Sequence, residues 1–224
     1  MIRYALLSCF LIISSILNAI CPCMQNKAAP FPPALMEELQ LAITLAKEAG
    51  RNAVPREMIY AALKEKFPES AWTVTTQTRD DVGVQIGLSQ SGQAVLGVNY
   101  FPTYDALYWA VKGQGAYRQI GDGPLERLQL SSSRVEVLTP VSYVENVALA
   151  ICHIAEGSPY NFYLSIEGEI EDFLSVDILL KEAGGVLTDG QGRPIDYRSQ
   201  DFKGIIACSN RRLYQKILEE LKTR

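Results

Sequence analysis

The sequence predicts an α+β protein whose helices and sheets pack in alternating layers. Three features of the 224-residue chain support this prediction: a helical apolar pattern opens the main body, strand-like segments follow, and helices then alternate with short strands. A helix that buries one stripe and a sheet that buries one face must pack against another element. This order of elements therefore favours a layered α/β/α/β sandwich.

Two helices are predicted at the start of the body. Apolar residues recur at helical spacing over residues 35–49, and Gly50 is expected to end that helix. Residues 56–67 repeat the pattern, and Pro68 cannot continue the helix.

Strands follow, because the apolar period changes from helical to alternating. Residues 82–88 and 94–100 are predicted as adjacent antiparallel strands, with the polar segment 89–93 as their turn. Further strands are expected at residues 106–111, 115–118 and 128–130.

The C-terminal part predicts alternating helices and strands. Residues 139–155 are mostly apolar and combine a strand with a helix. A helix over 173–183 ends at Gly184-Gly185, and short strands follow at 186–188 and 205–208. Asn210 is expected to cap a final helix over 211–221.

Composition excludes several functions. The formal net charge is −4 and no long basic block is present, which argues against a nucleic-acid binder. His153 is the single histidine and lies in the apolar run 148–155, so we interpret it as a packed structural residue rather than a catalytic base. Cys152 and Cys208 are flanked by apolar residues and are expected to be buried free thiols.

The N-terminal segment allows three interpretations. Arg3 is followed by residues 4–26 without a charge, a pattern typical of an export signal or a membrane anchor over residues 1–26. In that interpretation residues 4–20 form an isolated apolar helix that associates with a membrane. Alternatively, translation starts at Met24 and the protein is cytoplasmic, or the segment is a buried helix. Residues 27–34 are then a proline-containing linker to a domain over residues 35–224.

Two stretches resemble a known family. The first is LGVNYFPTYDALYWAVKGQGAY within residues 95–117, and the second joins Ala155-Glu156-Gly157, Asp172 and the KEAGG sequence at 181–185. Their order and spacing are similar to those of the inositol monophosphatase superfamily. Residues 118–128 look most like its 3'(2'),5'-bisphosphate nucleotidase branch. The resemblance covers residues 82–224, and more faintly 35–68.

The resemblance implies a layered α/β/α/β sandwich of the sugar-phosphatase type, truncated in its N-terminal half. It also implies a magnesium-dependent phosphomonoesterase that acts on a small phosphorylated metabolite. The family holds its metals with a D-x-x-T-x-x-D segment, a Glu-Glu pair, a D-P-x-D-G-T loop and the aspartate of a Trp-Asp pair. Several oxygen ligands are needed because Mg²⁺ demands an octahedral shell.

This chain lacks most of those acids. Where the family has W-I-V-D-P-x-D-G-T-R-D, residues 72–80 read WTVTTQTRD, without either aspartate of the loop. Asp172 matches the aspartate of the Trp-Asp pair, with Glu171 in place of the tryptophan, and is the candidate metal ligand and substrate-binding residue. Thr78 matches the threonine that orients the attacking water and is the candidate catalytic residue.

The sequence therefore favours lost or strongly impaired catalysis, with weak or absent Mg²⁺ binding. A makeshift site is an alternative, in which Asp172 is joined by the acids Glu69, Asp80, Asp81 and Glu171, although each is more typical of a solvated surface. Three hypotheses stay open: an active phosphomonoesterase with a reduced metal site, a pseudo-phosphatase that acts by binding a partner, and a decayed gene product.

Overall fold

The computed structural model describes residues 35–77, 83–131, 146–157, 161–165, 169–199 and 204–222. Residues 35–224 form a compact unit. The predictions for residues 4–20 and for a strand near residue 139 lie outside the described residues. Among the described helices, none is long and apolar enough to cross a membrane.

The chain forms helices and strands in two sheets. The first sheet has six strands in the order β1-β2-β3-β4-β5-β6, and the second has three in the order β7-β9-β8. The helices are α3 (Met36–Asn52), α4 (Arg56–Lys66), η1 (Pro102–Tyr104), α5 (Val147–Ala155), α6 (Glu171–Glu182) and α7 (Arg211–Lys222). The strands are β1 (Ala71–Gln77), β2 (Gly83–Gln90), β3 (Gln93–Phe101), β4 (Ala106–Val111), β5 (Gly115–Ile120), β6 (Glu126–Leu128), β7 (Phe162–Ser165), β8 (Val186–Asp189) and β9 (Ile205–Cys208).

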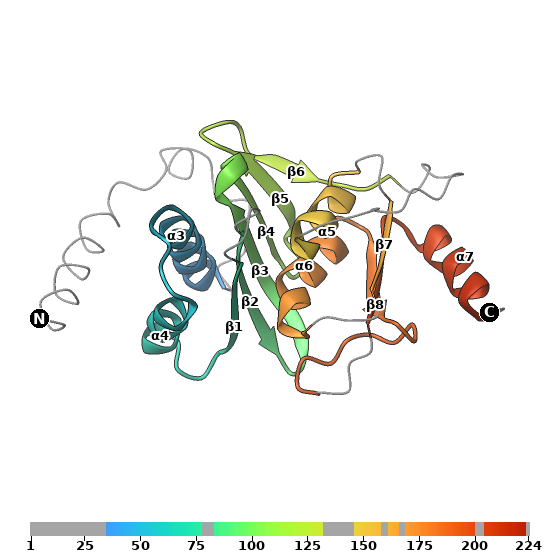
Figure 1. Cartoon of the computed structure of the whole chain (residues 1–224), viewed down its shortest axis with the longest axis horizontal. Coiled ribbons are helices and arrows are strands. Elements are labelled where there is room, and N and C mark those ends of the chain that lie inside the picture. The colour runs from blue at the N-terminus through green and yellow to red at the C-terminus, as the bar shows by residue number, and fades with distance from the viewer. Residues whose placement is uncertain are drawn as a thin grey trace, which may run out of the picture. The chain divides into compact units, whose positions relative to one another are not determined.

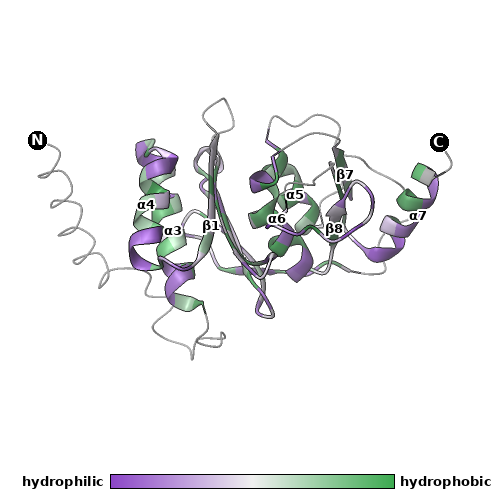
Figure 2. Ribbon diagram, turned by 90° about the horizontal axis from the view of Figure 1, so that it is seen from below, coloured by the Kyte–Doolittle hydropathy of each residue, from purple (hydrophilic) through white to green (hydrophobic). Residues whose placement is uncertain are grey.

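These elements pack in layers, as the sequence predicts. Helices α3 and α4 cover one face of the six-stranded sheet, and α5 and α6 lie between its other face and the small sheet (Figure 1). Helix α7 forms a further layer beyond the small sheet. Seen edge-on, hydrophobic residues concentrate in the large sheet and in α5 and α6, whereas α4 and α7 carry many hydrophilic residues (Figure 2). The layered α/β/α/β prediction is confirmed.

Helix α3 buries one stripe against the large sheet, and its end differs from the prediction. Its buried residues are Leu39, Ala42, Ile43, Ala46 and Ala49. The prediction that Gly50 ends the helix is wrong, because α3 continues to Asn52. Gly50 instead allows a close approach: a Cβ there would lie 2.5 Å from the Pro102 ring.

The predicted hairpin is confirmed, with a tighter turn. β2 and β3 pair antiparallel, with Ile86 opposite Val98. The turn is limited to Ser91 and Gly92, whose φ angles of 52° and 78° lie in the left-handed region. Such a two-residue turn matches the twist of the flanking strands, so the strands extend into the predicted turn segment.

Other boundaries were less well predicted. The strand expected at 128–130 is β6, which runs from 126 to 128. Strands β1 and β7 were not predicted at all. The helix expected from Phe173 begins at Glu171, so Asp172 lies inside its first turn rather than before it.

Helix α6 lies at the centre of the main core. Phe173, Leu174 and Leu179 are fully buried in the cluster that fills the space between the two sheets. Full burial of each such side chain contributes about 1.5–3 kcal/mol. The helix approaches β3 so closely that a Cβ on Gly97 would lie 2.1 Å from the Ser175 carbonyl oxygen. The Ser175 hydroxyl also donates a hydrogen bond of 2.7 Å to the Asn99 side chain.

The C-terminal end of α6 is tied to the turn between β4 and β5. The Glu182 carboxylate accepts hydrogen bonds from the backbone N–H of Gly113 at 2.7 Å and of Gly115 at 2.8 Å. Both glycines have positive φ, 77° and 93°, which presents their N–H groups to one acceptor. The two stretches that carry the family resemblance are therefore joined by one carboxylate.

The remaining structural predictions at the C-terminal end are confirmed. Gly184 ends α6 with a φ of 99°, and the Asn210 side chain accepts a hydrogen bond of 2.9 Å from the Leu213 N–H at the start of α7. Cys152 and Cys208 are buried free thiols. His153 lies on α5 and is partly buried.

Candidate active site

A cleft of about 650 Å³ opens where α4, β1 and the start of α6 meet. Strand β1 is the edge of the large sheet, α4 lies over one of its faces and α6 over the other. The cleft is lined by Arg56, Glu57, Tyr60, Trp72, Thr73, Val74, Thr75, Glu169, Glu171 and Asp172. Of the two site residues predicted from the sequence, Thr78 and Asp172, the structure describes Asp172, and Asp172 lies in this cleft.

Asp172 is held by two hydrogen bonds. Its partly buried carboxylate accepts them from the Thr75 hydroxyl on β1 and from the Glu169 backbone N–H. Burial raises the pKa of Asp172, and the neighbouring carboxylates of Glu171 and Glu169 raise it further, while the two hydrogen bonds lower it. The net pKa is above its ordinary value. Asp172 therefore occupies a position where negative charge is already crowded.

The other residues predicted for the site do not all lie in the cleft. Thr78, Asp80 and Asp81 lie outside the described residues. Glu69 is exposed in the turn after α4, whereas Glu171 lines the cleft beside Asp172. Among the described acids of the proposed makeshift site, Glu171 therefore lies in the cleft with Asp172, and Glu69 does not.

Sequence reasoning missed residues that reach the cleft through tertiary packing. Glu57 comes from α4 and Glu169 from the segment before α6. Thr75 had a usable signal, since it stands where the family has the first aspartate of its D-P-x-D-G-T loop. Glu169 had a weaker signal, three residues before Asp172, a spacing at which a backbone N–H reaches a side chain in the following turn.

The described residues do not fit a catalytic magnesium site. Magnesium needs near-ideal octahedral oxygen coordination, usually with carboxylates that hold it directly. Nowhere in the described part of the chain do three or more His, Cys, Asp or Glu side chains converge in a way that could hold a metal ion. The Asp172 carboxylate is instead engaged by Thr75 and Glu169.

A second polar cluster contains the Ala155-Glu156-Gly157 motif. The Glu156 carboxylate accepts a hydrogen bond of 2.5 Å from the Tyr108 hydroxyl and pairs with Arg118 at 2.9 Å. Arg118 also pairs with Glu126 at 2.5 Å. Arg118 and Glu126 thus bind each other, and the cluster ties α5 to β4, β5 and β6.

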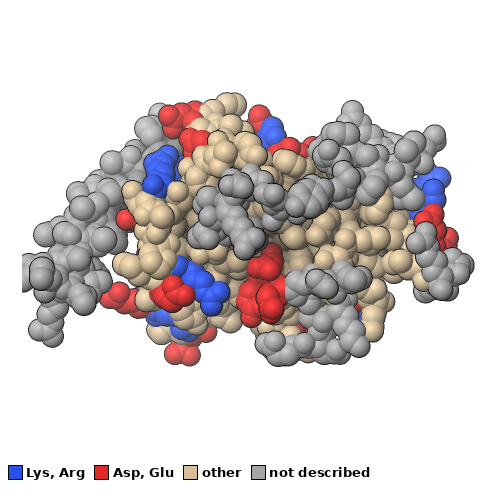
Figure 3. All heavy atoms as spheres, in the orientation of Figure 1, with Lys and Arg blue, Asp and Glu red and all other residues tan. Residues whose placement is uncertain are grey.

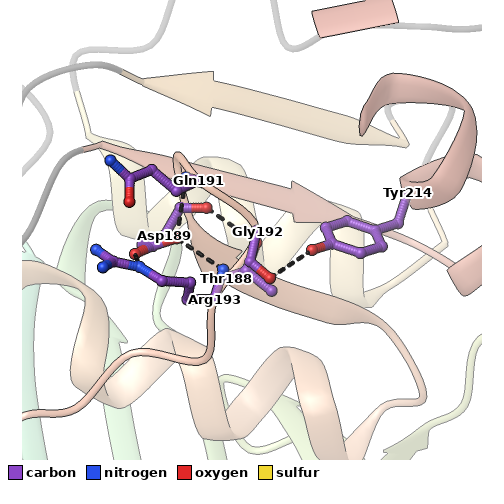
Figure 4. A network of polar contacts seen from close by, with 6 residues as sticks. All are labelled: Thr188, Asp189, Gln191, Gly192, Arg193 and Tyr214. Carbon is purple, nitrogen blue, oxygen red and sulfur yellow. Dashed lines mark hydrogen bonds and ion pairs between the residues drawn. The ribbon is translucent and has the colours of Figure 1, made fainter. Parts of the chain in front are cut away.

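A third polar cluster stabilises the loop after β8 (Figure 4). The Asp189 carboxylate accepts hydrogen bonds from the N–H of Gln191 at 2.9 Å and of Arg193 at 2.7 Å, and from Arg193 Nε at 2.7 Å. The Tyr214 hydroxyl on α7 donates to the Gly192 carbonyl at 3.1 Å. Asp189 holds the loop together and Tyr214 ties the loop to α7, so the role of this acid is structural.

Comparison with known proteins finds similar proteins in one family. The family model described as the inositol monophosphatase family matches residues 126–224. The chain is 28% identical over 146 residues to fructose-1,6-bisphosphatase/inositol-1-monophosphatase of Methanothermobacter thermautotrophicus, covering 56% of this chain and 51% of that protein. It is 26% identical over 168 residues to human inositol monophosphatase 2, covering 63% and 57%. These matches support the inositol monophosphatase superfamily, the family that the sequence resembles.

Solved structures show the same fold. CysQ from Bacteroides thetaiotaomicron, a bacterial member of the inositol monophosphatase family, superposes with a TM-score of 0.63 at 17% identity, covering 80% of this chain and 100% of that one. Inositol monophosphatase from Anabaena superposes with a TM-score of 0.70 at 19% identity, covering 84% and 96%. The chain spans about half the length of the curated relatives, 51% and 57% of the two above.

Proposed function

We propose that this member of the inositol monophosphatase superfamily has lost most or all of its phosphomonoesterase activity and acts by binding. The observation that carries the proposal is the hydrogen bond from Thr75 to Asp172, which links the acid that matches the family's metal shell to a neutral hydroxyl. At the matching position the family has an aspartate.

The charge of the cleft supports this proposal. Among the described residues, the carboxylates of Glu57, Glu169, Glu171 and Asp172 line it together with the guanidinium of Arg56. Phosphoryl transfer requires positive groups or metal ions that neutralise the phosphoryl oxygens. A phosphomonoester carries negative charge and is repelled by a cleft with this lining.

The proposal also covers the substrate, the roles of Thr78 and Asp172, and the localisation. If residual turnover exists, its substrate is a small phosphomonoester, either an inositol monophosphate or a nucleotide such as 3'-phosphoadenosine 5'-phosphate. Thr78 would orient the attacking water, and Asp172 would contact the metal and the substrate. Association with a membrane through residues 4–20 stays a prediction, and so does the cytoplasmic alternative.

Metal affinity tests the proposal. We expect Mg²⁺ or Mn²⁺ titrated into the full-length protein to bind no more tightly than roughly millimolar, since few ligands are present. Asp172→Asn should weaken that binding further, while the matched control Asp196→Asn, at an exposed acid paired with Arg198, should leave it unchanged. Isothermal titration calorimetry measures all three proteins. Micromolar binding that Asp172→Asn abolishes would show a rebuilt metal site and contradict the proposal.

A further inference from the structure

Strand β1 forms an unusually unprotected sheet edge. Its seven residues, AWTVTTQ, include no charge, proline or glycine. They pair along the whole strand with β2, from Ala71 opposite Ser89 to Gln77 opposite Gly83. Among the described strands β1 has no partner on its other side. Natural sheet edges are usually shortened, charged or interrupted, because free backbone groups recruit other strands.

The opposite edge of the same sheet provides an internal comparison. Strand β6 has three residues, and its Glu126 and Arg127 are exposed charged side chains. This edge has the short length and the charges that prevent pairing with another chain. The absence of such protection on β1 is therefore specific to one edge of the sheet.

The cleft runs alongside the β1 edge. Residues 72–75 all line it, although successive side chains of a strand point to opposite faces. A cavity that touches four consecutive residues must lie beside the strand rather than over one face. Helix α4 borders this space on one side and the start of α6 on the other, which leaves room for an extended segment next to β1.

The lining of the cleft indicates the charge of its occupant. Glu57 forms an ion pair of 3.3 Å with Arg56. Glu169, Glu171 and Asp172 have no cationic partner among the described residues, and their mutual repulsion contributes to the raised pKa of Asp172. Figure 3 shows acidic side chains gathered near the border between the large sheet and α6. These groups complement lysine or arginine and oppose phosphate.

We infer that the β1 edge accepts an extended basic segment of a partner protein as an added strand. Backbone hydrogen bonds to β1 supply affinity, and lysine or arginine side chains of the segment reach Glu169, Glu171 and Asp172. The inference deepens the proposed binding function, because it names the class of partner that the same cleft takes.

A synthetic peptide tests the inference with the full-length protein. The probe is fluorescein-labelled acetyl-Lys-Val-Thr-Val-Arg-Thr-Val-Lys-amide, measured by fluorescence polarisation at low salt. One control peptide carries Glu in place of Lys and Arg, and a second keeps the charges but has alternate backbone amides N-methylated. Both controls should bind at least about tenfold more weakly, the first through lost charge and the second through lost strand pairing. Hydrogen exchange of β1 amides should slow when the basic peptide is bound.

Matched variants localise the binding. Glu169→Gln combined with Glu171→Gln should weaken binding of the basic peptide about tenfold. The control combines Glu48→Gln and Glu219→Gln, exposed acids on α3 and α7 that change the net charge equally, and should leave the affinity unchanged. Circular dichroism verifies that both double variants are folded.

Three results would overturn the inference. They are no binding of the basic peptide, equal binding of the N-methylated peptide, or a dimer by sedimentation whose β1 amides are already protected without peptide. The last result would mean that a second copy of the chain occupies the edge. If the peptide does not bind and no phosphatase turnover is seen, this inference is wrong. The proposed loss of catalysis is then still supported. Magnesium-dependent turnover would defeat the loss of catalysis whatever the peptide does.

Discussion

The Thr75 hydroxyl donates a hydrogen bond to the Asp172 carboxylate across the cleft between β1 and α6. In the family the position of Thr75 holds a second acid, and a metal ion between the two acids would screen their repulsion. A neutral donor satisfies Asp172 without a metal. The pair therefore holds the Asp172 carboxylate in place without a metal ion.

Removing the Thr75 hydroxyl should move the titration of Asp172. Thr75→Ala takes away a hydrogen bond that lowers the Asp172 pKa, so that pKa should rise above the wild-type value. The matched control is Thr73→Ala, whose hydroxyl bonds the Gly87 carbonyl and no carboxylate. Carbon-13 NMR of the aspartate carboxyl groups against pH measures both variants. An Asp172 titration that is the same in Thr75→Ala and wild type would show that the bond is not formed in solution.

The contact between Glu182 and the glycine turn should contribute to stability. Glu182→Gln replaces one carboxylate oxygen with an amide that cannot accept the second N–H, from Gly113 or Gly115. Charge-assisted hydrogen bonds contribute about 1.5–3 kcal/mol, so we expect the free energy of unfolding to fall by about 2 kcal/mol. Urea denaturation measures the loss. Glu48→Gln, on the exposed side of α3, is the control and should stay within about 0.5 kcal/mol of wild type.

Two glycine substitutions should differ in severity. In Gly97→Ala the new Cβ would lie 2.1 Å from the Ser175 carbonyl oxygen, and backbone atoms of α6 cannot move aside cheaply. We expect a loss of roughly 3 kcal/mol or more. In Gly113→Ala nothing lies within 4 Å of the new Cβ, and the cost arises from its φ of 77° alone, about 1–2 kcal/mol. Thermal and urea denaturation rank the two, and equal losses would contradict the close packing of α6 on β3.

The buried carboxylate of Asp177 should make stability depend on pH. Burial raises its pKa above 3.8, although Lys181, with Nζ at 2.7 Å, and Tyr197 oppose the shift. Because the pKa of Asp177 is higher in the folded state than in the unfolded state, the protonated carboxyl favours folding. This contribution to the free energy of unfolding is fully present below the pKa of the unfolded state, and it is lost as the pH rises through the pKa of the folded state.

Asp177→Asn is the test of this linkage, because the amide does not titrate. Between the two pKa values, wild type should lose about 1.4 kcal/mol of unfolding free energy per pH unit relative to the variant. Urea denaturation of both proteins at successive pH values from about 3 upward gives the difference. Parallel stability curves over that range would show that the folded state does not raise the Asp177 pKa.

The sequence predicted most of the fold because apolar periodicity records which face of an element is buried. The hairpin of β2 and β3 follows from alternation and a polar turn. Strand β1 also alternates, with Trp72 and Val74 next to threonines, so its pattern was present in the sequence although no strand was predicted there. Strand β7 is four residues long and exists through its pairing with β9, a long-range contact that a short sequence window does not contain.

The candidate site was predicted only where the family resemblance supplied a position. Asp172 was found in this way. Glu57 and Glu169 were not, because they reach the cleft only once α4 and the start of α6 pack against β1. Gly50 was also misjudged because its role depends on tertiary packing. A glycine at the end of an apolar pattern predicts the end of a helix, whereas here the close approach of Pro102 accounts for the glycine.

Magnesium-dependent phosphate release tests the loss of catalysis most directly. The full-length protein and Asp172→Asn are incubated with inositol monophosphate, fructose 1,6-bisphosphate, 2'-AMP and 3'-phosphoadenosine 5'-phosphate, with and without Mg²⁺. Inorganic phosphate is then measured. We expect wild type to release phosphate no faster than Asp172→Asn from any substrate, whether or not Mg²⁺ is present. Release from any one of them that requires Mg²⁺ and disappears in Asp172→Asn would show a working metal site and contradict the account.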